Sequence, residues 1–160
     1  MHAEALDYAA SLLTGRTFAA VVEVGGRNIN GGVRHLFTAD SYTAIDLHDG
    51  PGVDVVADCR DWKPASPVDL VVCMEVLEHA PDPKGVVDAC ISYLAPGGLL
   101  VLTAAGPGRE PHSGLDGAAV RGGEHYANID PGELRQWLSG LAEPQVTQRG
   151  PDVYAAGIRR

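Results

Sequence analysis

The chain has 160 residues, 45% of them hydrophobic, and its formal net charge is -9. The length allows one domain with a single core, so residues 1–160 are expected to fold as one unit, and the composition is that of a globular protein. The acidic balance argues against binding to the phosphate backbone of nucleic acids, which requires clustered Lys and Arg. No segment approaches the roughly 18 uninterrupted apolar residues that span a membrane, so no membrane partner is expected.

The cysteines and the N-terminus indicate a cytoplasmic protein. Cys59, Cys73 and Cys90 are odd in number and lack the spacing of metal ligands, so we interpret them as reduced, buried thiols. The first residues have neither the basic start nor the apolar run of a signal peptide. The sequence leaves the oligomeric state open, with a homodimer among the alternatives.

A short helix and an acid-glycine turn are predicted first along the chain. Apolar residues recur at helical spacing over 3–14, within a leading segment of residues 1–17. An apolar run then ends in Glu23-Val24-Gly25-Gly26, and residues 31–37 are expected to begin a helix. Parallel sheets present nucleotide-like ligands at such a turn, because glycines let the backbone approach and the helix N-terminus offers unpaired N–H groups. An ordinary strand-to-helix connection is the simpler alternative.

The next four strands are predicted from apolar runs bounded by turn residues, over 41–46, 53–57, 68–74 and 99–103. Asp46 ends the second strand, roughly 20 residues beyond the first turn, where a carboxylate can accept hydrogen bonds from both ribose hydroxyls of an adenosine. The alternative role of Asp46 is to cap its own turn.

Two capped helices, a long loop and a terminal strand pair are predicted in the second half. Asp82-Pro83 and Asp130-Pro131 each place an N-cap before a proline at the first helical position. Residues 105–128 are too long and too glycine-rich for a routine connection, which is typical of a substrate lid, with a surface excursion as the alternative. The tail predicts strands over 145–148 and 153–158.

Together these motifs resemble the class I S-adenosylmethionine-dependent methyltransferases, and most of all the group whose fourth strand ends in Glu-Val-Leu-Glu-His. The resemblance covers nearly the whole chain, from Phe18 to the last strand. The motifs that carry it are Glu23-Val24-Gly25, Asp46, Val56-Ala57-Asp58, Glu75 to His79 with Asp82-Pro83, and Leu94 to Gly98. The family turn has two later glycines, whose positions Arg27 and Ile29 occupy here; Gly31 and Gly32 then supply flexibility further along.

The resemblance implies an α/β fold, a doubly wound, Rossmann-like, seven-stranded and mostly parallel sheet of order 3-2-1-4-5-7-6 with one antiparallel strand. It implies S-adenosyl-L-methionine as the cofactor and methyl transfer to a small-molecule or glycan-type acceptor. Asp46 would hold the ribose, and Asp58 and Cys59 would border the adenine. The expected cofactor contacts are Glu23, Gly25, Gly26, Arg27, Asn28, Asn30, Asp46, Leu47, Asp58, Cys59, Met74 and Glu75.

His79, His112 and His125 are the candidate general bases or acceptor contacts, because imidazole titrates near neutral pH. Their alternative role is capping or hydrogen bonding, and the Glu78-His79 pair is expected to shape the turn that follows. Glu75, at the mouth of the fourth strand, is expected to contact the donor's amino end or the acceptor. No metal site is predicted, since the candidate ligands come from separate strand ends without recognisable spacing.

Two other functions stay open. A non-catalytic S-adenosylmethionine-binding module or accessory subunit would be consistent with the altered glycine turn. A nicotinamide-dependent oxidoreductase on the same kind of sheet is disfavoured, because no Tyr-x-x-x-Lys pair follows the turn.

Overall fold

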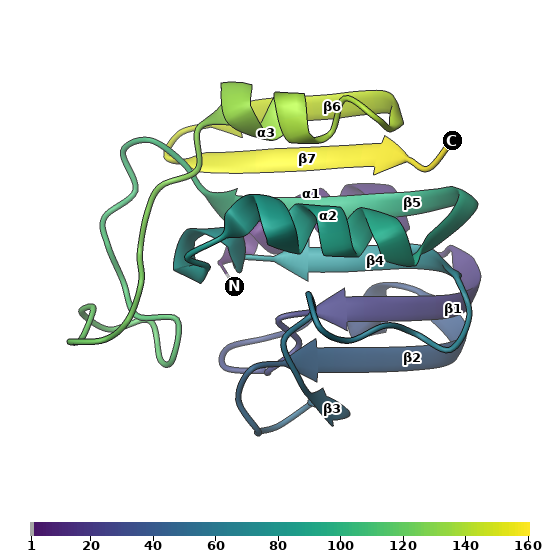
Figure 1. Ribbon diagram of the computed structural model, residues 1–160, viewed down its shortest axis with the longest axis horizontal. Helices are drawn as coiled ribbons and strands as arrows, with labels where there is room; N and C mark the ends of the chain where they lie inside the picture. The colour runs from purple at the N-terminus through teal and green to yellow at the C-terminus, as the bar shows by residue number, and fades with distance from the viewer. Residues whose placement is uncertain (1) are drawn as a thin grey trace.

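The computed structural model describes residues 2–160. A seven-stranded sheet of order β3-β2-β1-β4-β5-β7-β6 forms its centre (Figure 1). Its strands are β1 (Thr17–Val24), β2 (Thr38–Asp46), β3 (Val55–Val56), β4 (Val68–Met74), β5 (Leu94–Ala105), β6 (Ala142–Arg149) and β7 (Asp152–Ile158). The first five strands pair in parallel, and β7 is antiparallel to both of its neighbours. The predicted fold class and strand order are therefore confirmed.

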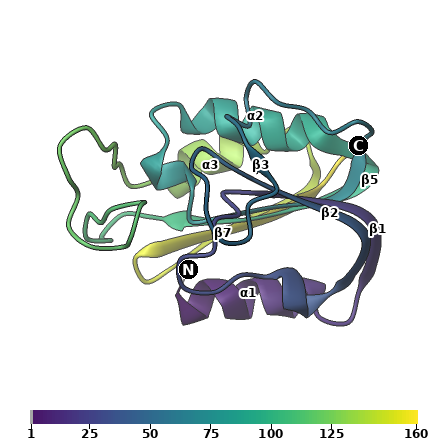
Figure 2. The ribbon, with the colours of Figure 1, turned by 90° about the horizontal axis from the view of Figure 1, so that it is seen from below.

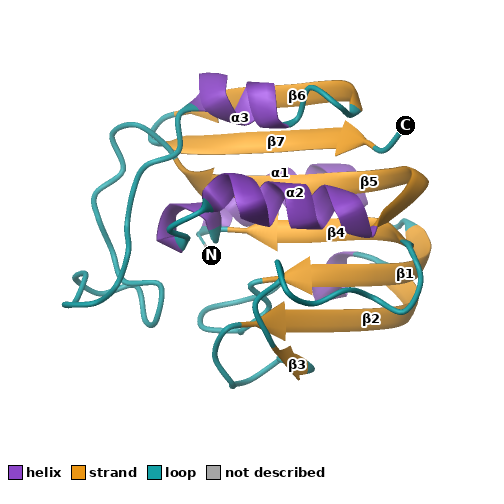
Figure 3. Cartoon of the chain, viewed as in Figure 1, coloured by secondary structure: helices purple, strands orange, loops and turns teal. Residues whose placement is uncertain are grey.

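Three α-helices and two 3₁₀ turns flank the sheet: α1 (Ala3–Leu13), η1 (Arg34–Leu36), η2 (Leu77–His79), α2 (Pro83–Tyr93) and α3 (Pro131–Trp137). Helix α1 covers one face, and α2 and α3 cover the other (Figures 2 and 3). Both predicted N-caps are confirmed. The carboxylate of Asp82 accepts a hydrogen bond from the Gly85 N–H, and that of Asp130 accepts from Gly132 and Glu133, which satisfies otherwise unpaired donors.

The alternation of side chains along the central strands produces two core layers. Val21, Leu70 and Val72 face α1 and pack with Ala5, Ala9 and Leu13. Their sequence neighbours point to the other face, where the layer against α2 and α3 contains Val22, Val71, Cys73, Leu100, Leu102, Leu134 and Leu138. All three cysteines are buried and free, as interpreted from the sequence.

The helix predicted over 31–37 is wrong. Only the short turn η1 forms there, and β2 begins at Thr38, three residues earlier than expected. The ring of Phe37 packs edge-on to Phe18 and stacks on Tyr42, with centroid distances of 5.5 and 6.1 Å, which draws the chain directly into the sheet. The β1–β2 connection therefore offers no helix N-terminus to a ligand.

Further strand boundaries differ from the prediction: β6 begins at Ala142, three residues early, and β7 begins at Asp152, one residue early. β5 begins at Leu94, five residues early, and β3 contains only two residues. Within residues 2–160, none of the helices has the length and apolar character required to cross a membrane.

Candidate functional site

The glycine turn after β1 ties together the ends of three strands. Gly25 has a left-handed φ of +75°, and a Cβ added there would lie 2.2 Å from Cγ2 of Val76, just beyond β4. The N–H groups of Gly25 and Gly26 both donate to the carbonyl of Ile45 in β2, at 2.9 and 3.0 Å. Gly25 is thus required both by backbone conformation and by close packing.

The carboxylate of Glu23, the acidic residue before this turn, forms a hydrogen bond with a side chain of the neighbouring strand β2. The hydroxyl of Tyr42 donates to its carboxylate, and the guanidinium of Arg34 lies 4.6 Å from the centre of the Tyr42 ring. Burial raises the pKa of Glu23. Its visible contacts are therefore to neighbouring strands, and its predicted cofactor contact stays a prediction.

Asp46 lies at the end of β2 with hydrogen-bonding capacity left over. One carboxylate oxygen accepts from the Arg27 N–H at 3.2 Å and the other from the His48 N–H at 2.9 Å. Each oxygen keeps a second lone-pair direction. The arrangement combines the predicted turn cap with a carboxylate that can still accept from a ligand.

Exposed apolar side chains occur on the segments that adjoin Asp46. Ile29, Leu47 and Val56 are 47%, 63% and 55% exposed, although large aliphatic side chains are usually buried. Leu47 follows Asp46 in the chain, Val56 pairs with Asp46 in the sheet, and Ile29 lies on the turn after β1. A ligand whose hydroxyl groups donate to the carboxylate and whose ring system contacts the apolar side chains, such as an adenosine, fits this arrangement.

The side chains on the turn are engaged with the protein. Arg27 donates from Nη2 to the Leu115 carbonyl at 2.5 Å, and Oδ1 of Asn28 accepts from the Gly31 N–H at 2.8 Å. Asn30 is exposed on the same turn. Contact of these side chains with a ligand carboxylate stays a prediction.

Asp58 and Cys59 lie beyond β3, where Arg60 holds the carboxylate. Asp58 accepts from Nε of Arg60 at 3.0 Å and from Nη2 at 2.6 Å, and this pairing lowers its pKa. The hydroxyl of Tyr93 donates to the carbonyl of buried Cys59. Asp58 is thus positioned near the expected adenine edge but is not free.

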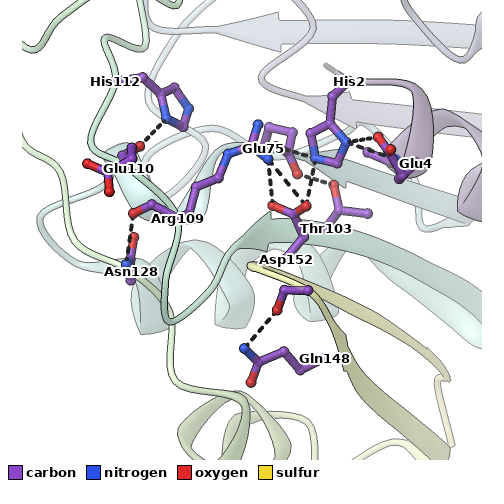
Figure 4. Close-up of polar contacts among 12 residues, drawn as sticks. His2, Glu4, Glu75, Thr103, Arg109, Glu110, His112, Asn128, Gln148 and Asp152 are labelled. Atoms are coloured by element: carbon purple, nitrogen blue, oxygen red, sulfur yellow. Dashed lines mark hydrogen bonds and ion pairs between the residues drawn. The ribbon is translucent and has the colours of Figure 1, made fainter.

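The parallel strands end at one edge of the sheet, here called the carboxyl edge, and the residues above lie at its β1–β3 half. At its other half, five polar side chains converge after β4 (Figure 4). Glu75 has a φ of +56° and accepts from Oγ1 of Thr103 at 2.8 Å. His2 Nε2 lies 3.2 Å from Glu75 Oε2 and 3.5 Å from Asp152 Oδ2. Asp152 also pairs with Nη1 of Arg109, at 3.2 and 3.3 Å. Met74, at the end of β4, is 8% exposed.

The charges in this group shift one another. Contact with Glu75 raises the pKa of His2, while burial raises that of Asp152. Burial alone would raise the pKa of Glu75, but the contacts with His2 and Thr103 lower it overall. A cleft of about 600 Å³ adjoins the group between α1 and the β6–β7 hairpin, with Tyr8, Arg109 and Tyr154 among its lining residues.

A second polar group forms around η2. Glu78 is fully buried, and its carboxylate oxygens, Nδ1 of His79 and the hydroxyl of Tyr126 have no hydrogen-bond partner within residues 2–160. Burial, and then the charge of Glu75, raises the pKa of Glu78 to about 8. Burial, and then His112, lowers the pKa of His79 to about 4.

Of the three candidate bases, His79 and His112 pack against each other, whereas the side chain of His125 is exposed. The rings of His79 and His112 lie 5.0 Å apart, and each also packs against Tyr126. His125 is exposed. The predicted turn-shaping by the Glu78-His79 pair agrees with its place in η2.

Residues 106–130 form no regular element and lie along the carboxyl edge (Figure 1). The loop is anchored at both halves. Leu115 accepts from Arg27 near β1, and the Ala127 N–H donates to the Glu78 carbonyl near β4 at 2.8 Å. Buried Ser113 donates to Oε1 of Glu124 at 2.6 Å, which closes the loop on itself.

Two groups have donor sets that a metal ion could use, each with three potential ligand atoms within 4.8 Å of one another. They are Glu78 with His79 and His112, and His2 with Glu75 and Asp152. The sequence prediction weighed Glu75, His79 and the loop histidines as ligands, together with Asp46 and His48, and predicted no metal site because their spacing matches no recognisable pattern.

His2, Thr103, Arg109 and Asp152 were not among the predicted site residues. Asp152 begins β7, and because β7 is antiparallel its first residue lies at the edge where the parallel strands end. That signal was available in the predicted topology. His2 and Arg109 reach the site from a helix start and a loop, and no local pattern identifies them.

Comparison with known proteins identifies the family. A family model described as a methyltransferase domain matches residues 6–141. The ubiquinone biosynthesis O-methyltransferase of Psychrobacter arcticus is 39% identical over 105 residues, which cover 53% of this chain and 40% of that protein. The enzyme of the same name from Xanthomonas campestris is 36% identical over 116 residues, covering 66% and 46%. The chain thus spans less than half the length of these relatives.

Solved structures share the fold. A DhpI–SAH complex superposes with a TM-score of 0.69 at 24% identity, covering 96% of this chain and 82% of that one. Phosphoethanolamine N-methyltransferase 2 of Haemonchus contortus, in complex with S-adenosyl-L-methionine, gives a TM-score of 0.71 at 12% identity, covering 98% and 52%. With the match to residues 6–141 and the confirmed strand order, the chain belongs to the methyltransferase-domain family.

Proposed function

We propose that this chain binds S-adenosyl-L-methionine and catalyses transfer of its methyl group to a small-molecule acceptor. The observation that carries the proposal is the placement of Asp46, with free lone pairs and exposed apolar neighbours, beside the glycine turn of a methyltransferase domain. The curated relatives, which are named ubiquinone biosynthesis O-methyltransferases, support a small-molecule acceptor. A glycan-type acceptor is the alternative.

In this proposal the β1–β3 half of the edge binds the donor. Asp46 accepts from the ribose hydroxyls, Leu47 and Val56 contact the adenine, and the backbone of Gly25 and Gly26 approaches the methionine portion. Asp58 accepts from the adenine amine through Oδ2, because Oδ1 already accepts from both the backbone N–H and Nε of Arg60. The cofactor, when bound, supplies an activated methyl group on a sulfonium.

The β4–β7 half and the loop serve the acceptor. The loop of residues 106–130 acts as a lid that excludes water, because methyl transfer depends mainly on positioning of donor and acceptor. His79 has a pKa of about 4, which makes it a weak base at pH 7, so its role in this proposal is to contact and orient the acceptor as a neutral imidazole. His112 lies against His79, whereas exposed His125 becomes the weakest of the three candidates.

Calorimetry with S-adenosylhomocysteine tests the donor site. Asp46→Ala should weaken binding by about 2–4 kcal/mol if two charge-assisted hydrogen bonds are lost. Asp49→Ala is the matched control, since Asp49 is exposed nearby and accepts only from the adjacent Gly50 N–H. Unchanged affinity in Asp46→Ala would remove the ribose assignment, and preferential binding of NAD would favour an oxidoreductase.

A non-catalytic S-adenosylmethionine-binding module is the second candidate. It is favoured by Arg27 and Ile29 at the family's glycine positions, and by the bond from Arg27 to Leu115, which places the loop against the turn. Turnover on a panel of acceptors separates the two candidates, because a binding module would bind S-adenosylhomocysteine without methylating any of them.

A further inference from the structure

The carboxylate of Glu75 is held where donor and acceptor would meet. β1 and β4 pair with Val24 opposite Cys73, so the glycine turn and Glu75 leave neighbouring strands at the same edge. Val76 contacts Gly25 directly. A left-handed φ in a residue with a side chain is unfavourable and is retained only where surrounding contacts enforce it. Here the hydrogen bond from Thr103 fixes the side chain.

The carboxylates of Glu75 and Asp152 flank the imidazole of His2, and Glu78, whose pKa burial raises to about 8, adds a neutral carboxyl group at pH 7. Asp152 approaches from β7 and Glu78 from η2, while the nearby cations are His2 and Arg109, of which Arg109 is already paired with Asp152. Glu78 is fully buried with both oxygens unpartnered within the described chain, and it interacts electrostatically with Glu75. A buried carboxyl without a partner is unfavourable unless a ligand supplies a donor. The position between Glu75 and Asp152, which His2 Nε2 occupies at 3.2 and 3.5 Å from their oxygens, therefore favours a ligand group that carries hydrogen-bond donors and gains positive charge.

These charges discriminate between acceptor atoms. An alkylammonium acceptor first loses a proton to water, and the neutral amine then attacks the methyl carbon; the N–C bond forms as the S–C bond breaks, and the electron pair of that bond stays on sulfur. Positive charge thereby moves onto nitrogen, next to Glu75, and the methylated ammonium then loses a proton to water. A phenol must first become a phenolate, and neighbouring carboxylates oppose that ionisation.

We propose that the acceptor is an amine whose nitrogen lies at Glu75, in the position that the His2 imidazole takes in this structure. The inference rests on the proposed function and names its substrate class. The remainder of the acceptor extends into the cleft between α1 and the β6–β7 hairpin, where the rings of Tyr8 and Tyr154 lie 5.1 Å apart. The assignment differs from the O-methylation in the names of the curated relatives.

Ligand titrations of the S-adenosylhomocysteine-loaded protein test the proposal. Benzylamine is compared with benzyl alcohol, and aniline with phenol, so that each pair differs in one acceptor group. Each amine should bind at least about tenfold more tightly than its oxygen counterpart. Glu75→Gln should abolish that preference, and both proteins are compared at saturating S-adenosylhomocysteine, so that a change in donor affinity does not enter the comparison. Glu143→Gln is the matched control. Glu143 also adopts a left-handed φ, of 51°, but it lies in β6.

The outcomes are distinct. If S-adenosylhomocysteine fails to bind, the proposed function is wrong. If it binds but the amines show no preference, or do not bind, only the amine assignment is overturned. With methyl-labelled donor, tyramine offers both groups in one molecule, and mass spectrometry should locate the methyl on nitrogen; a methyl on the phenol oxygen contradicts the assignment.

Discussion

The β1–β3 half and the β4–β7 half of the carboxyl edge hold their carboxylates by different contacts. Asp46 is held by two backbone N–H groups from turns close to it in the fold, and its apolar neighbours are exposed. Glu75 and Asp152 are held by side chains from a helix start, a neighbouring strand and a loop. The first half is therefore held by backbone groups of its own turns, whereas the second depends on side chains that come from separate parts of the chain.

The largest expected effect comes from removing the loop that joins the halves. Deleting Gly108–Gly122 removes His112, Ser113 and the Leu115 contact with Arg27. Turnover should be lost, while affinity for S-adenosylhomocysteine should change by less than about 1.4 kcal/mol. Calorimetry and methyl transfer assays measure the two effects.

A single substitution tests the same role of the loop in case the deletion variant does not fold. Ser113→Ala removes the bond to Glu124 and the acceptor for the Leu115 N–H, which loosens the loop without shortening it. It should lower turnover in the same direction. Methylation at the original rate in both variants would make the loop a surface excursion.

Gly25→Ala should disturb the contact between the turn after β1 and Val76, which follows β4. The added Cβ would meet Val76 at 2.2 Å, and the left-handed φ adds strain, so the free energy of unfolding should fall by about 3 kcal/mol. Gly15→Ala has the same φ of +75° but no atom within 4 Å, and should lose only about 1 kcal/mol. Equal losses in urea denaturation would show that packing against Val76 contributes nothing.

The buried Glu78 should make stability depend on pH. Its folded pKa of about 8 lies above its ordinary 4.5, so the folded chain keeps a proton that the unfolded chain releases, and stability falls as pH rises between these values. His79, lowered from 6.5 to about 4, gives the opposite slope below pH 6.5. The net fall should therefore appear between pH 6.5 and 8, at about 2 kcal/mol.

Glu78→Gln should remove this fall, because the amide does not ionise in that range. Exposed Glu133→Gln serves as the control. Urea denaturation at a series of pH values measures the slopes, and an unchanged slope in Glu78→Gln would assign the dependence to another group.

The smallest effect is expected at the adenine edge. Asp58→Asn should weaken S-adenosylhomocysteine binding by about 1 kcal/mol or less, since the amide keeps one acceptor and Arg60 already occupies the carboxylate. Asp61→Asn is the control, because Asp61 is exposed and lies three residues after Asp58. A greater loss than in Asp46→Ala would misplace the adenine.

The strand order was predictable because strand-end motifs matched a family whose topology is known. The helix over 31–37 was not excluded by any local rule. The short turn η1 forms there because Phe37 packs against Phe18 and Tyr42. The contact with Phe18 joins segments that are distant in the chain, so a local sequence pattern cannot predict it.

The candidate site divides in the same way. Asp46 and Glu75 were found because they end strands, and the position of a strand end is a local property. His2, Thr103 and Arg109 meet Glu75 or Asp152 only after folding brings remote residues together. Asp152 could have been found from the antiparallel direction of β7.

The open connection between β1 and β2 makes the protein suitable for site-specific labelling. An atom added at Gly32 would meet nothing within 4 Å, and the residue lies four positions beyond Asn28 on the ligand turn. The native thiols are buried, and burial raises the pKa of Cys59 to about 12, which suppresses reaction with alkylating dyes. A cysteine introduced by Gly32→Cys would therefore react selectively, and its fluorophore would report donor binding without competing labels.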